Sequence, residues 1–160
     1  MTNMKVRESS LELTLKNELS EIERAAKIIS SHGHSYGWPD EWLYKINISV
    51  DELITNTVNY SYGNQSARSI LLKLVATYDK LTVTIEDDGQ PFNPFENVPS
   101  ADHVEASLED RPIGGLGVHL VKALMDEFSY ERTADGLNRI TLVQLRESQD
   151  DVEPGPPGSG

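Results

Sequence analysis

The stretch SILLKLVATYDKLTVTIE, residues 69–86, contains two runs of apolar and β-branched residues around a short turn. Residues 69–77 and 81–86 each have the composition of a strand, and the second run alternates apolar with polar side chains. A connection as short as residues 78–80 joins neighbouring strands as a hairpin, which makes the pair antiparallel. The stretch therefore predicts a sheet that is largely antiparallel.

The segments before this hairpin change from a strand pattern to helix patterns. Residues 11–15 alternate apolar and polar side chains, which is the period of a half-buried strand. Residues 17–29 repeat apolar side chains every three or four positions, as one face of a helix does. A break is expected at residues 31–37, and the next helix should start at Pro39 and end near Tyr62.

A long connection and a second hairpin follow. Residues 87–117 hold four prolines and few periodic apolar residues. A connection of about 30 residues is typical of a functional lid or a disordered segment, and we expect it to be mobile. A helix is predicted at 118–128, and strands at 130–132 and 139–145 should close the domain. The acidic, then Pro- and Gly-rich, tail at 147–160 should be disordered.

The order of these elements predicts the fold class. Strands that come in adjacent pairs, with clustered helices, favour a two-layer α/β (α+β) sandwich, in which helices cover one face of a mixed, largely antiparallel sheet. A doubly wound parallel fold would need strands and helices in alternation. Residues 1–146 are long enough for a single domain with a sizeable core.

Composition limits the classes of function. The chain has 160 residues and no cysteine, which excludes disulfides and thiolate metal sites and favours the cytoplasm. We expect neither a secretory signal nor a membrane span, because no apolar run approaches the roughly 20 residues that a span needs. The net charge is −12. Four acidic residues and no basic one follow Arg146, so residues 1–146 carry −8 and should repel nucleic acid. Solubility explains the acidity, and a basic protein partner stays open.

The second helix carries a carboxylate and an amide one turn apart. Glu52 and Asn56 lie beside its apolar stripe rather than in the middle of it, at about 100° per residue. The Asn side-chain oxygen is a suitable ligand for Mg²⁺, and a neighbouring carboxylate can orient a nucleophile or accept its proton. The alternative for this pattern alone is an ordinary solvated pair on a helix face.

Two glycine-containing turns can likewise be interpreted either as parts of a nucleotide site or as ordinary turns. Asp87-x-Gly89 leaves a strand, where a fixed carboxylate can accept a hydrogen bond from an exocyclic amine such as that of adenine, and the glycine lets backbone approach a flat ring. The same sequence is common in ordinary turns. Gly114 and Gly115, then Leu116 and Gly117, open the third predicted helix.

Glycines at the start of a helix can present backbone N–H groups to an anion, and the helix dipole adds to the attraction. The alternative is a flexible hinge. Arg111 can reach a terminal phosphate or can be a solvated loop residue, and the second interpretation is slightly favoured. No Gly-Lys-Ser/Thr follows the glycines, so they do not form a Walker loop.

Three motifs in this order resemble the N, G1 and G2 boxes of the GHKL (Bergerat-fold) ATPases: Glu52-x-x-x-Asn56, Asp87-x-Gly89 and Gly115-x-Gly117. The resemblance covers residues 10–146. With GGLGVHLVKALMDE at 114–127, the chain is most similar to the bacterial stand-alone anti-sigma-factor serine/threonine kinases. Pro91 and Tyr60 depart from many members, which have Gly and His there.

The resemblance implies a cofactor, ATP with Mg²⁺, and a role for each residue. Asn56 would bind the metal, Glu52 would polarise the attacking hydroxyl, and Asp87 would bind the adenine amine. The ring would pass Gly89, and the Gly115-Leu116-Gly117 loop would wrap the phosphates. His119 is expected to pack within its helix rather than accept phosphate. Without a dimerisation helix pair, a complete sensor histidine kinase is not expected.

Three functions follow from these observations. The first is an ATP-dependent protein serine/threonine kinase that phosphorylates a small anti-anti-sigma-like protein and also sequesters a sigma factor. The second is a nucleotide-sensing module that holds a partner protein without significant turnover. The third is an interaction domain that binds no nucleotide. The resemblance also suggests a homodimer through the first strand and helix.

Overall fold

The computed structural model describes residues 9–62, 68–96 and 117–146. In chain order its elements are β1 (Ser9–Lys16), α1 (Glu21–Ser35), α2 (Asp40–Asn56), the π-helix η1 (Thr57–Ser61), β2 (Ser69–Ala76), β3 (Lys80–Asp87), α3 (Gly117–Leu124), β4 (Glu127–Arg132) and β5 (Asn138–Leu145). None of the helices in these ranges is long and apolar enough to cross a membrane.

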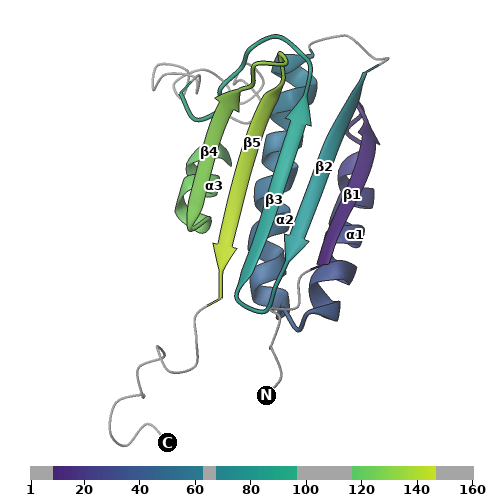
Figure 1. The fold of residues 1–160 in the computed structure, drawn as a ribbon, viewed down its shortest axis with the longest axis vertical. Coiled ribbons are helices and arrows are strands. Elements are labelled where there is room, and N and C mark those ends of the chain that lie inside the picture. Colours follow the sequence, from purple (N-terminus) through teal and green to yellow (C-terminus); the bar gives the residue numbers. More distant parts are fainter. Residues whose placement is uncertain (1–8, 63–67, 97–116, 147–160) are drawn as a thin grey trace, which may run out of the picture.

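The strands form one sheet in the order β1-β2-β3-β5-β4, and all four pairings are antiparallel. The quoted hairpin is β2 and β3, with Leu74 opposite Val83, and it lies in the middle of the sheet. The helices α1, α2 and α3 all lie on the same side of the sheet (Figure 1). The predicted two-layer sandwich with a largely antiparallel sheet is therefore confirmed.

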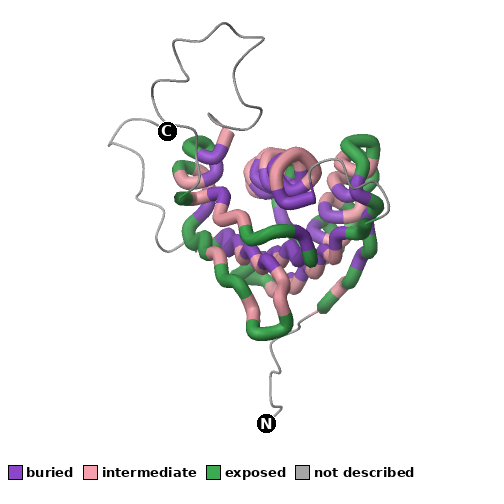
Figure 2. The backbone as a smooth tube through the Cα atoms, turned by 90° about the horizontal axis from the view of Figure 1, so that it is seen from above, coloured by how far each residue is buried: buried purple, intermediate pink, exposed green. Residues whose placement is uncertain are grey.

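The hydrophobic core lies between the helix layer and the sheet. Seen from above, buried backbone positions gather where the two layers face each other (Figure 2). Every second residue of the central strands points into it, because side chains alternate between the faces of a strand. The largest fully buried side chains include Trp38, Leu15, Ile29, Leu43, Ile46, Leu53, Ile54, Ile70, Leu72, Leu74, Leu81 and Ile85.

The predicted break at residues 31–37 is wrong, because α1 continues to Ser35. Gly33 lies inside the helix, where it faces Leu43 of α2. A Cβ on Gly33 would overlap the Leu43 side chain. The glycine is thus a contact point that lets two helices approach closely, and the turn follows it at Gly37, whose φ is 77°.

The second helix ends at Ser61, close to the predicted Tyr62, whereas the third helix ends earlier than predicted. The second helix changes to a π-helix after Asn56, where the Thr57 hydroxyl donates to the Leu53 carbonyl at 3.1 Å. The third helix ends at Leu124 rather than at residue 128. Asp126 ties the chain to β5 instead, since its carboxylate accepts the Leu145 N–H at 2.7 Å, and β4 begins at the next residue.

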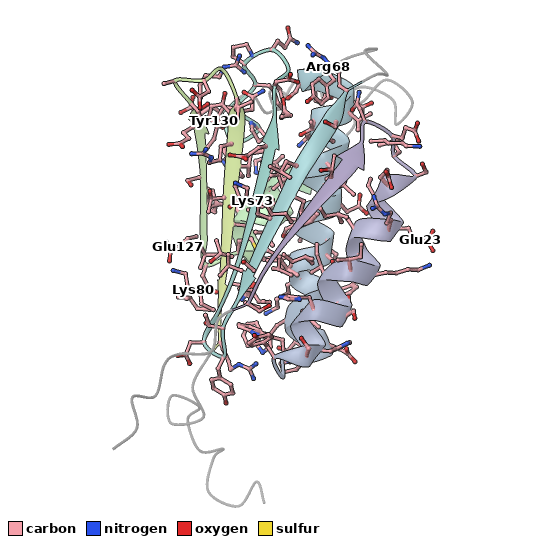
Figure 3. All side chains as sticks on the ribbon, turned by 45° about the vertical axis from the view of Figure 1, so that its right-hand side comes forward. Glu23, Arg68, Lys73, Lys80, Glu127 and Tyr130 are labelled. Atoms are coloured by element: carbon pink, nitrogen blue, oxygen red, sulfur yellow. The ribbon has the colours of Figure 1, made fainter. Side chains whose placement is uncertain are left out.

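The helix-free face of the sheet carries a row of charges of alternating sign, one from each strand. Lys73 of β2 lies 3.9 Å from Glu12 of β1 and 3.6 Å from Glu86 of β3. Arg139 of β5 contacts Glu86 and Glu131 at 2.6 Å each. Lys73 is labelled in the middle of the sheet in Figure 3. A charged row of this kind keeps the open face polar and solvated.

Candidate functional site

Glu52 points from α2 toward the start of α3. Its side chain is half-buried, and its Oε1 has no hydrogen-bond partner among the described residues. Burial raises the pKa of Glu52, and the neighbouring charge of Asp51 raises it further. A half-buried carboxylate oxygen without a partner is costly, so its position indicates a role other than stabilising the fold.

Gly117 is the residue against which Glu52 packs. A Cβ at this position would overlap the Glu52 carboxyl group. Because Gly117 has no side chain, the Glu52 carboxyl group can lie against the N-terminal end of α3. Helix N–H groups and the helix dipole favour a negative charge there. Two residues far apart in the sequence are thus brought into direct contact.

The rest of α3 is held in place by apolar side chains on one face of the helix. Val118 and Val121 are buried, and Met125 just after the helix continues the same stripe. His119 falls on the other side of α3 and is exposed. The expectation that His119 packs within the structure is therefore wrong, because the helix period places residues 118, 121 and 125 inward instead.

Asn56 is the last residue of α2 and lies one turn beyond Glu52. It is buried, with 3% of its surface exposed. Its side chain makes no hydrogen bond to any residue in the described ranges. The π-helix begins at the next residue, and such irregular turns are frequent at functional sites. The buried amide oxygen is therefore available as a ligand.

The Asp87 carboxylate is fixed at the end of β3. It is 3% exposed, and its Oδ1 accepts hydrogen bonds from the Gly89 N–H and the Asn138 amide, both at 2.9 Å. Burial raises the pKa of Asp87, and these two hydrogen bonds partly oppose the rise. Within the described residues Oδ2 accepts no hydrogen bond. One oxygen thus holds the turn, and the other is left for an external donor.

Gly89 lets this turn pack closely on the π-helix. A Cβ at Gly89 would lie 2.5 Å from the Ser61 carbonyl oxygen, which is too close for any side chain. The same carbonyl accepts the Gln90 N–H at 3.0 Å, and the Gln90 amide donates to the Tyr60 carbonyl at 2.8 Å. The Asp-x-Gly turn and the end of the long helix therefore form one connected unit.

Asn138 is a site residue that the sequence did not reveal. It is 1% exposed at the start of β5, directly opposite Asp87. Its amide nitrogen donates to Asp87 and to the Gln90 carbonyl, at 2.9 and 2.8 Å. Its oxygen accepts from the Phe92 N–H and from the Tyr130 hydroxyl, at 3.2 and 2.6 Å. One side chain thus ties the Asp87 turn to the two last strands.

Aromatic and basic side chains complete the turn. The rings of Tyr60 and Phe92 stack with centroids 5.1 Å apart. Burial raises the pKa of Tyr60, and the charge of Glu52 adds to the rise, which places Tyr60 within electrostatic reach of Glu52. Arg132 of β4 donates to the Gly89 carbonyl at 2.8 Å.

The structure thus places five of the predicted site residues in two groups. Glu52 and Gly117 touch, and Asp87 and Gly89 share a hydrogen bond, while Asn56 joins α2 to the unit that carries the Asp87 turn. Gly115, Leu116 and Arg111 lie outside the described residues, as do residues 97–116 of the long connection and the tail at 147–160.

Comparison with known proteins agrees with this arrangement. The family described as "Histidine kinase-like ATPase domain" matches residues 15–144, which is most of the chain. The chain belongs to this ATPase family. The GHKL resemblance seen in the three motifs is therefore confirmed.

Curated relatives narrow the branch of the family. The serine-protein kinase RsbW of Listeria monocytogenes is 31% identical over 145 residues, which cover 88% of each chain. The serine/threonine-protein kinase BtrW of Bordetella bronchiseptica is 28% identical over 106 residues, covering 66% of this chain and 72% of its own. The chain therefore falls in the anti-sigma-kinase branch of the histidine kinase-like ATPases.

A solved structure supports the fold of this branch. The RsbU and RsbW domains of a Mycobacterium tuberculosis protein align with a TM-score of 0.61 at 16% identity. The alignment covers 88% of this chain and 34% of that longer one, so the histidine kinase-like domain matches about a third of it. At this identity the likeness concerns the fold alone.

The residues of this family member fit Mg-ATP on chemical grounds. A buried amide oxygen and a nearby carboxylate are the oxygen ligands that Mg²⁺ accepts, in a site that keeps several waters. The free oxygen of Asp87 can accept an exocyclic amine. The N-terminal end of α3 at Gly117 can attract an anion through its N–H groups and the helix dipole. The adenine and metal ends of the nucleotide thus have counterparts among the described residues.

Proposed function

We propose that the chain is an ATP-dependent protein serine/threonine kinase that phosphorylates a small anti-anti-sigma-like regulatory protein. The position of Glu52 carries this proposal, because its carboxyl group is half-buried at the glycine that opens α3 and its Oε1 has no hydrogen-bond partner among the described residues. The relatives named as serine and serine/threonine kinases support the reaction type. Sequestration of a sigma factor and formation of a homodimer stay predictions.

The adenine end of ATP is assigned to the turn after β3. The free Oδ2 of Asp87 would accept the exocyclic amine of adenine, and the bare backbone at Gly89 would pass along the ring. Asn138 holds the other carboxylate oxygen and so fixes which lone pairs face the base. Because the donor of guanine lies at another ring position, this arrangement favours adenine nucleotides.

The phosphate end is assigned to α2 and the start of α3. Asn56 would hold Mg²⁺, which neutralises charge on the phosphates. The backbone of Gly115, Leu116 and Gly117 would contact the phosphate oxygens, and Arg111 would approach the terminal phosphate. The negative body of the chain makes such local devices necessary for holding a polyphosphate.

Glu52 is assigned the role of general base. The seryl or threonyl oxygen attacks the γ-phosphorus and forms the new P–O bond. The bond from that phosphorus to the β–γ bridging oxygen breaks, and ADP leaves with the electron pair. The hydroxyl proton passes to a Glu52 oxygen and then to solvent. The raised pKa of Glu52 brings it closer to neutral pH, which suits a base that must release its proton again.

Transfer of phosphate from ³²P-labelled ATP to a candidate regulatory protein, with Mg²⁺, tests the proposal. Glu52→Gln should bind ATP with near wild-type affinity and lose transfer by at least about a hundredfold, within the range typical of a general base. Glu127→Gln, an exposed glutamate on β4, is the matched control and should transfer normally. Transfer by Glu52→Gln at the wild-type rate would remove Glu52 from the reaction.

The same experiment addresses the nucleotide-sensing alternative. If the wild-type chain binds ATP and the regulatory protein but leaves it unphosphorylated, the chain is a binding module. The half-buried carboxyl group of Glu52 argues against this alternative, because a module that only binds nucleotide has no need for a positioned base.

A further inference from the structure

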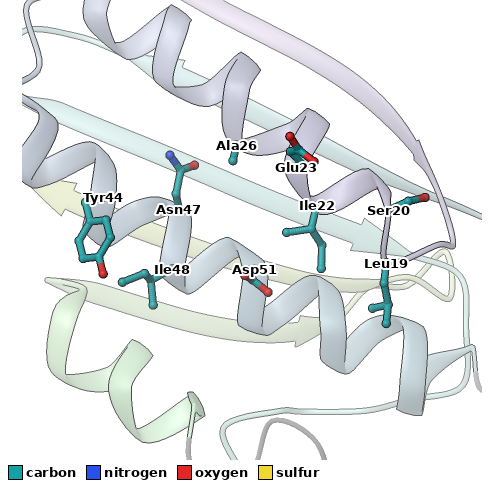
Figure 4. Close-up of a pocket in the computed structure, with 9 residues that line it drawn as sticks. All are labelled: Leu19, Ser20, Ile22, Glu23, Ala26, Tyr44, Asn47, Ile48 and Asp51. Atoms are coloured by element: carbon teal, nitrogen blue, oxygen red, sulfur yellow. The ribbon is translucent and has the colours of Figure 1, made fainter.

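The outer surface of the helix layer contains an apolar groove between α1 and α2. The groove has a volume of about 530 Å³. Its apolar lining comes from Leu19, Ile22 and Ala26 on the α1 side and from Tyr44 and Ile48 on α2. Figure 4 shows Leu19 and Ile22 pointing toward α2, and Tyr44 and Ile48 on α2 itself. Nothing within the described residues covers them.

The exposure of this lining is unusual for large apolar side chains. Tyr44 has 68% of its surface exposed and Leu19 has 48%. A second hollow on the other side of α2 shares Tyr44 and Ile48 and adds Leu120 and Leu124 of α3. The apolar strip therefore runs from α1 across α2 to α3. Contiguous exposed apolar surface with a polar rim marks a binding surface.

The rim of the strip is mostly acidic. Glu23 and Asp51 line the first hollow, and Asp40 and Glu41 line the second. Lys45 is the single basic residue among the lining residues, and its amine lies over the Trp42 ring, 4.5 Å from the centroid. Glu23 projects outward from α1 (Figure 3). An apolar floor between carboxylates is complementary to an apolar helix face flanked by Lys or Arg.

We propose that this groove is a docking site for a basic amphipathic helix of a partner protein. An amphipathic helix would place residues at i, i+3, i+4 and i+7 along the floor and its basic residues along the acidic rim. Two of the four rim carboxylates already have a basic neighbour, since Glu23 lies 3.2 Å from Lys27 and Asp40 lies 2.6 Å from His34. The site lies on the outer side of α1 and α2, away from the turn after β3. It does not depend on the proposed kinase activity.

The charge of the chain argues against most of its own segments as the occupant. Residues 97–116 carry four acidic residues against one Arg, and residues 147–160 carry four acidic residues and no Lys or Arg. Both would meet an acidic rim. A second copy would bring another chain of net charge −12. Only residues 1–8, with Lys5 and Arg7, have a suitable charge, and the experiment must test them.

The probe is a synthetic 16-residue helical peptide with Leu at i, i+3, i+4 and i+7 and Lys on its polar face. At about 1.5 Å per residue it is about 24 Å long, which matches α1. Two control peptides have Glu in place of Lys, or the same residues in an order without an apolar stripe. Fluorescence anisotropy measures their affinity for the full chain. The Lys peptide should bind at least about tenfold more tightly than either control. Two or three surface ion pairs supply that factor against the Glu peptide, and the apolar contact that is lost supplies it against the reordered peptide.

Variants of the chain locate the binding. Tyr44→Ala and Ile48→Ser should each weaken Lys-peptide binding at least about fivefold, because each removes apolar contact area. Tyr78→Ala, which removes another highly exposed tyrosine far along the sequence, is the matched control and should bind normally. Because Tyr44 is so exposed, its variant should fold even if Ile48→Ser does not.

Several results would overturn the proposal. These are equal binding of the Lys and Glu peptides, no binding of the Lys peptide, or full binding to Tyr44→Ala. Tighter binding to a chain that lacks residues 1–8 would instead assign the groove to that segment. A dimer in light scattering that dissociates in Tyr44→Ala would assign it to a second copy. ATP affinity, measured on the same samples, should not change, so a failure here is distinct from a failure of the proposed function.

Discussion

Replacing Asn138 by Ala should separate the Asp87 turn from the strands that hold it. The side chain makes four hydrogen bonds, to Asp87, Gln90, Phe92 and Tyr130. Its loss leaves Asp87 Oδ1 with only the Gly89 N–H as a donor. Because the carboxylate is buried, the missing amide also raises the pKa of Asp87 further.

The expected cost follows from the number and burial of these bonds. A hydrogen bond contributes about 0.5–1.5 kcal/mol net, and leaving a buried group unsatisfied costs about 1–3 kcal/mol. We expect a total loss of about 2–4 kcal/mol, because the exposed partners can bond to water instead. For a domain of this size that corresponds to a fall in Tm of about 5–15 °C. The affinity for ATP should fall about ten- to a hundredfold, since the adenine acceptor is no longer fixed.

Thermal unfolding and titration with a fluorescent ATP analogue measure the two effects. Gln144→Ala is the matched control, because Gln144 is also a buried amide on β5 and bonds to Asp126, away from the Asp87 turn. It should lower Tm and leave the ATP affinity unchanged. The reasoning is refuted if Asn138→Ala loses no more affinity for ATP than Gln144→Ala does.

Three further predictions concern the helices. Burial raises the pKa of Glu52 above its usual value of 4.5, so the folded state favours the protonated side chain. The contribution of Glu52 to folding stability is therefore full below pH 4.5, and it is lost as the pH rises through the raised pKa and the buried carboxyl group ionises. Glu52→Gln should therefore be more stable than the wild type by about 0.5–1 kcal/mol at pH 8, and no more stable at pH 4. The gain is small because the side chain is partly exposed. Urea unfolding that shows no difference at pH 8 would contradict this prediction. Gly117→Ala should displace the Glu52 carboxyl and lower phosphoryl transfer at least about tenfold while the far-UV circular dichroism spectrum is retained, and a normal rate would show that this contact is dispensable. Gly33→Ala should cost about 1–3 kcal/mol by overpacking against Leu43, and combining it with Leu43→Ala should cost less than the sum, whereas strict additivity in denaturant unfolding would rule out that contact.

Much of the fold was predictable because local patterns and topology agree. The β2–β3 hairpin has a short turn between two strand-like runs, and that connection allows only an antiparallel pair. Gly33 shows where local patterns mislead. A glycine among Ser and His residues is typical of a helix end, and only the approach of Leu43 from another helix explains why it lies inside one. Such a contact depends on tertiary packing.

Candidate site residues can be picked from the sequence where a residue acts through its own motif. Glu52, Asn56 and Asp87 stand at spacings that suggest their chemistry, and their roles stay predictions. Asn138 carries no local signal, because it follows an ordinary hairpin turn and lies 51 residues from Asp87. Its importance arises only when β5 pairs with β3. The contact between Glu52 and Gly117 likewise depends on how α3 packs against α2.

The most direct test of the nucleotide site is a calorimetric titration of Mg-ATP into three proteins. These are the wild type, Asp87→Asn and Asp79→Asn, in which the last change lies in the exposed turn between β2 and β3 and serves as the control. The wild type and Asp79→Asn should bind one ATP with equal, roughly micromolar affinity, and Asp87→Asn should bind at least about tenfold more weakly. Equal binding by Asp87→Asn, or no binding by the wild type, would contradict the assignment of this site.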